Sequence, residues 1–110
     1  MRTYTILLTL FALHIAIPVS SAHAAGEIEA KQLYVQSLAA TCANCHGTEG
    51  HALSGATVPG LAGHSADELV AQMKAFRSGE RKATIMHQIA KGFSESQTQL
   101  LAEYFAGQKR

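Results

Sequence analysis

Apolar residues recur at helical spacing along the chain after residue 25. Ile28, Leu33 and Leu38 belong to a run without glycine or proline, which predicts a first helix from Glu27 to about Ala40. This helix is expected to end against the motif Cys-x-x-Cys-His at residues 42–46.

A second helix is predicted to begin after Ser65, because Ser65 and Glu68 have the spacing of a capping box. Leu69, Met73 and Phe76 then fall on one helix face, and Gly79 is typical of a helix end. The pattern therefore predicts an amphipathic helix that packs one face inward.

The last third of the chain predicts two more helices. A short one spans Thr84 to Lys91 and stops at Gly92, and a longer one follows the capping pair Ser94 and Gln97 and closes at Gly107. No convincing strand pattern is present, so the fold class is all-α.

The region from Gly47 to Gly63 contains five glycines and one proline, which predicts an irregular loop. No repeat or linker interrupts the chain after Ala25, so residues 25–110 are expected to form one domain.

The first 24 residues have the layout of a secretory signal peptide. Arg2 precedes an apolar run from Ile6 to Ile17, and Ala22-His23-Ala24 offers a small-residue cleavage site. At about 1.5 Å per residue, the run falls well short of the roughly 30 Å of a bilayer core. We expect cleavage after Ala24 or Ala25, no membrane span afterwards, and a periplasmic location.

The overall charge argues against binding to nucleic acid. Nine Lys and Arg residues face eight Asp and Glu, and the counts become equal without Arg2. Lys74, Arg77, Arg81 and Lys82 are nonetheless close in sequence. They form either a basic rim that orients a partner or an ordinary solvated surface.

Cys42, Cys45 and His46 admit three interpretations. A thioredoxin-like redox pair would need a βαβ context, for which the chain has no strand pattern. A zinc site would need two more ligands, and the chain has no second Cys pair, although two of His46, His51, His64 and His87 could complete a Cys₂His₂ set. Covalent attachment of haem needs the two thiols for the vinyl groups and the following histidine for the iron, and it suits an exported, small, helical chain best.

The second axial ligand of such a haem would come from later in the chain. Met86 lies forty residues after His46, beyond the predicted helix end at Gly79. Met73 is the other thioether and fits a core role on its own helix. His87 is a rival, although neighbours on a helix point about 100° apart, so only one of Met86 and His87 can face the iron.

The motif with a single methionine some forty residues later resembles class I cytochromes c over nearly the whole of residues 25–110. The segment FRSGERKATIMHQIAKGFS, Phe76 to Ser94, is similar to the axial-methionine region in the haem subunit of flavocytochrome c sulfide dehydrogenase. TCANCHGTEG, Thr41 to Gly50, is shared with cytochromes of the c4 and c553 kind.

This resemblance implies thioether bonds from Cys42 and Cys45 to one haem c, with His46 and Met86 as iron ligands. It also implies that the Pro59 carbonyl accepts a hydrogen bond from the His46 ring. The expected fold is the small class I cytochrome c fold, in which helices wrap around the haem.

The implied function is one-electron transfer. An iron bound by both His46 and Met86 has no open position, so the chain is not expected to be catalytic alone. The resemblance implies that the chain is the haem subunit of a sulfide dehydrogenase, with a flavoprotein subunit as the expected electron donor and another protein as the acceptor. The alternatives are a free electron carrier of the c553 or c4 kind, and a haem sensor or enzyme in which Met86 dissociates.

Overall fold

The structure, a computed structural model, describes residues 20–110, with side chains from residue 24 onward. Four α-helices and two 3₁₀ turns follow one another along this part of the chain, and it contains no strand. The prediction of an all-α fold is confirmed. The predicted signal peptide, residues 1–24, lies largely outside the described residues.

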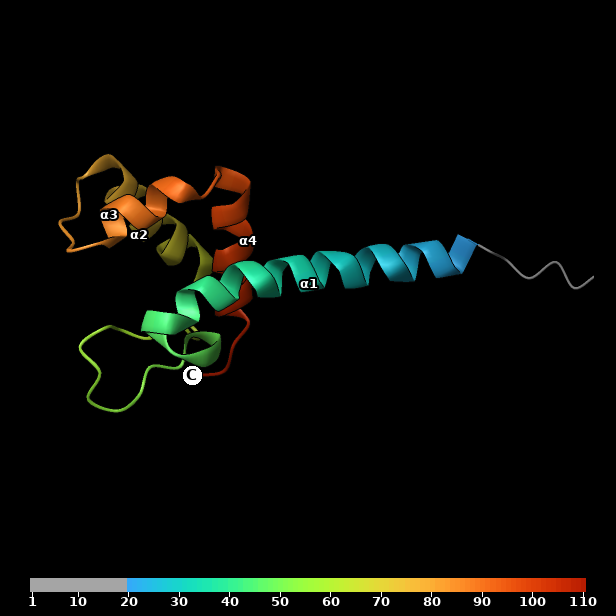
Figure 1. The fold of residues 1–110 in the computed structure, drawn as a ribbon, viewed down its shortest axis with the longest axis horizontal. Helices are drawn as coiled ribbons and strands as arrows, with labels where there is room; N and C mark the ends of the chain where they lie inside the picture. Colours follow the sequence, from blue (N-terminus) through green and yellow to red (C-terminus); the bar gives the residue numbers. More distant parts are fainter. Residues whose placement is uncertain (1–19) are drawn as a thin grey trace, which may run out of the picture.

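Helix α1, Ser20–His46, is longer than the pattern predicted, and it continues through the whole cysteine motif. Nothing in residues 41–46 breaks a helix, and the last turn closes with a hydrogen bond from Gly47 N to Ala43 O at 3.0 Å. Residues 24–34 are all exposed, and this half of α1 projects from the other helices in Figure 1. The apolar spacing there therefore predicted the helix correctly but not its burial, since Ile28 is 68% exposed.

Helices α2, Ala66–Ser78, and α4, Glu95–Ala106, begin at the predicted caps. Ser94 and Gln97 form both halves of a capping box. Ser65 accepts a hydrogen bond from Glu68 N at 3.2 Å, but the Glu68 carboxylate contacts His64 instead of completing the box. Gly79 ends α2 in the left-handed conformation, as predicted.

Between these two helices, the predicted short helix is divided in two. Helix α3 comprises only Met86–Ile89, and the 3₁₀ turn η2, Ala90–Gly92, follows it directly. Helix α3 therefore begins at Met86, and irregular backbone connects Gly79 to this residue.

The core lies where α1 crosses α4. Ala39, Leu101 and Phe105 form its buried cluster, and Leu38 and Cys42 pack against it. Phe105 also accepts a hydrogen bond through its backbone oxygen from Gly63 N at 2.9 Å. The C-terminus therefore lies beside the loop that follows α1, as Figure 1 shows.

That loop contains the 3₁₀ turn η1, Thr48–Gly50, and its path depends on glycine at two positions. Gly47 has φ 85° and ψ 159°, which is a region of backbone conformation that only glycine occupies readily. A β-carbon on Gly50 would lie 2.9 Å from Phe105 Cδ1, so the loop also packs tightly on the core.

We predict that Gly47→Ala lowers the free energy of unfolding by at least about 2 kcal/mol, because the added methyl group combines an unfavourable φ with a collision against the His51 carbonyl. Gly92→Ala is the matched control, since Gly92 has no atom within 4 Å of its β-carbon position. Urea denaturation followed by circular dichroism measures both variants. Equal midpoints for the two would contradict the prediction.

Candidate functional site

One large cavity lies between the end of α1, helix α2, the segment around α3, and α4. Its volume is about 520 Å³, within the range of about 300–1,000 Å³ typical of pockets that enclose a small-molecule ligand. Most of its wall is apolar. The residues that line it include the haem-binding candidates from the sequence, namely Cys42, Cys45, His46, Pro59 and Met86, together with Met73.

The two thiols and the imidazole reach this cavity from the last two turns of α1. Positions 42, 45 and 46 are separated by three and four residues, so a continuous helix places them on one face. The extension of α1 through the motif is thus what brings the three groups together. A helix that ended at Ala40 would have left their relative directions undefined.

A backbone oxygen of the loop that follows α1 fixes the orientation of the His46 ring. Its Nδ1 lies 2.6 Å from Pro59 O. A carbonyl oxygen can only accept, so Nδ1 carries the proton and donates it to this hydrogen bond. Nε2 is then the atom with a free lone pair, which is the form of imidazole that binds a metal ion.

No disulfide joins the two cysteines, and their surroundings differ. Cys42 packs against the core, and burial raises the pKa of its thiol above the ordinary value, with a smaller opposing effect from Thr41. Thr41 Oγ1 lies 4.0 Å from Cys42 Sγ. Cys45 is exposed at the edge of the cavity.

Two thioethers line the cavity, one more than the sequence pattern suggested. Met86 is half-buried and comes from the start of α3. Met73 belongs to α2 and was expected to serve the core, yet it also reaches the cavity wall. His87, the rival of Met86, does not line the cavity.

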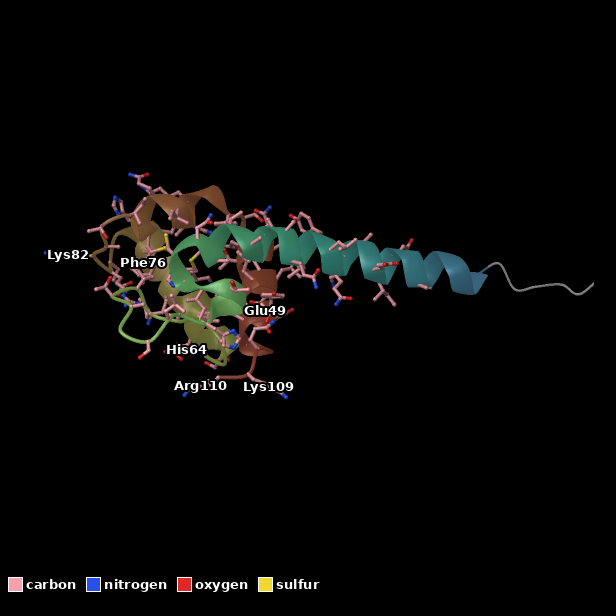
Figure 2. The ribbon with its side chains drawn as sticks, turned by 60° about the horizontal axis from the view of Figure 1, so that its bottom comes forward. Glu49, His64, Phe76, Lys82, Lys109 and Arg110 are labelled. Atoms are coloured by element: carbon pink, nitrogen blue, oxygen red, sulfur yellow. The ribbon has the colours of Figure 1, made fainter. Side chains whose placement is uncertain are left out.

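The polar side chains of the cavity wall were not predicted from the sequence to lie together. Arg81 stacks on the Phe76 ring, with its guanidinium carbon 4.6 Å from the ring centre, and it also hydrogen-bonds to Gln72. Its neighbour Lys82 is exposed and lies at the end of the molecule opposite the projecting half of α1 (Figure 2). In the sequence, the positive charge of Arg81 was the one feature that could have pointed to a place in the cavity wall.

Arg77 corrects the hypothesis of a four-residue basic rim. Its guanidinium is half-buried and donates hydrogen bonds to Ala90 O, Phe93 O and Thr98 Oγ1. Arg77 thus directs its charge into the protein, and Lys74, Arg81 and Lys82 are the exposed members of the group.

The zinc and thioredoxin interpretations gain no support from residues 20–110. No group of three or more His, Cys, Asp or Glu side chains within this part of the chain could hold a metal ion. His51 is instead tied to two carbonyl oxygens, with Nε2 2.7 Å from Lys109 O and Nδ1 3.1 Å from Thr48 O. His64 pairs with Glu68, close to the C-terminal residues Lys109 and Arg110 in Figure 2.

The chain belongs to the cytochrome c family, whose model matches residues 28–108. It is a class I c-type cytochrome, a protein that transfers electrons through a covalently bound haem c. The side chains of the cavity fit a haem c, because both thiols, the His46 imidazole and two thioethers line a wall that is otherwise largely apolar.

Individual relatives act in different electron-transfer systems. The chain is 37% identical over 68 residues to the cytochrome subunit of sulfide dehydrogenase from Chlorobaculum tepidum, covering 62% of this chain and 60% of that one. It is 47% identical over 73 residues to a thiosulfate dehydrogenase electron acceptor from Stutzerimonas stutzeri, covering 62% and 33%. It is 39% identical over 72 residues to cytochrome c-554(548) from Halomonas halodenitrificans, covering 63% and 86%.

The chain thus spans less than two thirds of the length of the first two relatives. None of the helices within residues 20–110 has the length and apolar character needed to cross a membrane.

Proposed function

We propose that this cytochrome carries single electrons through a haem iron held by His46 and Met86, with Cys42 and Cys45 as its covalent attachment points. The observation that carries the proposal is that all four side chains line one cavity, with the lone pair of His46 Nε2 left available by the Nδ1 hydrogen bond to Pro59. When bound, the haem supplies the one-electron couple.

The residues around this site serve electron transfer and not turnover of a small molecule. Ligation by both His46 and Met86 would leave the iron without an open position, and a thioether ligand would raise the reduction potential relative to a second imidazole. Pro59 keeps the imidazole in one tautomer and orientation. The apolar wall excludes water, which limits the reorganisation that accompanies a change of charge.

The two cysteines can be tested by the spectrum of the attached group. We expect Cys42→Ser and Cys45→Ser each to leave one thioether, which shifts the pyridine haemochrome band toward that of haem with a free vinyl group. The double variant should release its haem into acidified acetone. Thr41→Val is the control, since Thr41 lines the same cavity and offers no thiol. A double variant that retained covalent haem would contradict the assignment of Cys42 and Cys45 as the attachment points.

Met86 and Met73 can be separated by a matched pair of substitutions to leucine, a swap of similar volume. Met86→Leu should abolish the sulfur-to-iron charge-transfer band of the ferric protein and lower the reduction potential. Met73→Leu should leave both nearly unchanged. The opposite pattern would assign the ligand to Met73 instead.

For the biological role, we propose that the chain is the haem subunit of an exported sulfide dehydrogenase and receives electrons from a flavoprotein subunit. The name of the Chlorobaculum relative and the resemblance of residues 76–94 support this role. Oxidation of sulfide at a flavin yields two electrons, and one haem accepts them one at a time. The cytochrome would therefore pass each electron to a downstream acceptor protein before taking the next.

A free periplasmic carrier is the second candidate. The match to cytochrome c-554(548) covers 86% of that protein, so that relative consists of little more than this one domain. In both roles, residues 1–24 act as a signal peptide and residues 25–110 form the mature periplasmic domain.

Isolation from the native host distinguishes the two roles. For the subunit role, we expect a flavoprotein to co-purify at a fixed ratio, and sulfide added to this complex should reduce the haem. A haem-containing monomer without a flavoprotein would favour the free carrier. Intact-mass measurement of the same sample should give a polypeptide that begins at residue 25 or 26 and carries one haem.

A further inference from the structure

Arg77 lies in the last turn of α2 and makes three hydrogen bonds to the chain that follows Met86. Its Nε donates to Ala90 O at 3.2 Å, and its Nη2 donates to Phe93 O at 2.6 Å and to Thr98 Oγ1 at 3.3 Å. No ion pair with Asp or Glu is found for Arg77 in the described part of the chain. Its charge is therefore balanced mainly by these three oxygen atoms.

The three acceptors surround the end of the segment that contains Met86. Ala90 comes one helical turn after Met86 and is fully buried, with 0% exposure. Phe93 lies in the connection to α4, and Thr98 is a buried residue of α4 with 3% exposure. One planar guanidinium thus joins α2, α4 and the end of the stretch from Met86 to Phe93, which we call the α3 segment.

The α3 segment needs such an external support. Helix α3 has four residues, and its N-cap, Ile85, makes no side-chain hydrogen bond. A helix of this length is not stable by itself, since its few hydrogen bonds do not offset the cost of nucleation. Its first residue, Met86, is preceded by irregular backbone from residue 80 onward. The position of Met86 is consequently set by what holds the other end of the segment.

Arginine suits this task better than lysine. Its rigid fork can donate to two backbone oxygens at once, and the two carbonyls of Ala90 and Phe93 present such a pair. Both carbonyls follow the last turn of a short helix, where backbone oxygens lack partners within the helix.

We propose that Arg77 is a positioning residue for Met86: by binding the backbone four and seven residues after it, Arg77 holds the thioether at the cavity wall and opposes its displacement from the iron. This inference rests on the proposed ligation by Met86. Arg77 touches neither the iron nor the sulfur and acts through the backbone of the α3 segment.

The test is a titration of the ferric, haem-loaded protein with imidazole, which competes with the thioether for the iron. Arg77→Leu is expected to bind imidazole roughly tenfold more tightly than the wild type, because hydrogen bonds from a charged donor are lost. Arg77→Lys should recover only part of this difference, since it keeps the charge and loses the fork. Lys74→Leu, an exposed cation on the same helix, should match the wild type.

Each outcome bears on one hypothesis. A wild-type protein without the sulfur-to-iron band would reject ligation by a methionine, and with it the basis for this role. If the band is present but imidazole affinity is unchanged in Arg77→Leu, the positioning role is wrong, even if urea denaturation shows a loss of global stability. If Arg77→Leu does not fold, the Arg77→Lys variant provides the test. An imidazole affinity of Arg77→Lys equal to that of the wild type would then overturn the proposal.

Discussion

The packing of α4 against α1 through Phe105 is the contact on which the rest of the site depends. Its ring is buried with Ala39 and lines the cavity, and its backbone oxygen holds Gly63. Gly50 packs against the same ring. One residue thus relates the helix that carries the cysteine motif to the loop that carries Pro59, so the hydrogen bond behind His46 follows from the packing of the core.

The two sides of the cavity are built with different rigidity. The thiols and the imidazole project from the end of a long helix that the core holds directly. The methionine side is a four-residue helix within an irregular segment. Because so short a helix contributes little stability of its own, its position depends on hydrogen bonds from outside. The half-buried guanidinium of Arg77 provides two of these, to Ala90 O and Phe93 O, and a third bond to Thr98 Oγ1 joins it to α4.

This difference has a consequence for electron transfer. An iron site transfers electrons readily when its ligands and surroundings change little between the two oxidation states, so both axial sides need to be held in place. On the His46 side, the Pro59 carbonyl fixes the imidazole, and the proposed covalent attachment at Cys42 and Cys45 would add to this support. On the other side, the proposed ligand Met86 would be supported only by non-covalent contacts. Under that proposal, the segment from Met86 to Phe93 is the part of the site where a substitution would alter ligation without altering attachment.

Patterns of residues close together in the sequence were sufficient to predict most of the helices and the kind of cofactor. Helical spacing and capping residues predicted α2 and α4 closely, because a cap and its helix lie within a few residues of each other. The motif at residues 42–46 predicted a haem for the same reason, since both thiols and the imidazole belong to one stretch of chain. The conclusion that the chain is a c-type cytochrome needed no tertiary information.

Contacts between distant residues were decided only by the tertiary structure. The sequence could not show that residues 24–34 of α1 are exposed, because an apolar spacing defines a face but not what covers it. It could not place Met73 beside the cavity as well as Met86. It also grouped Arg77 with surface charges, because the three oxygens that bind its guanidinium lie 13, 16 and 21 residues further along the chain and meet it only when α2 and α4 pack together.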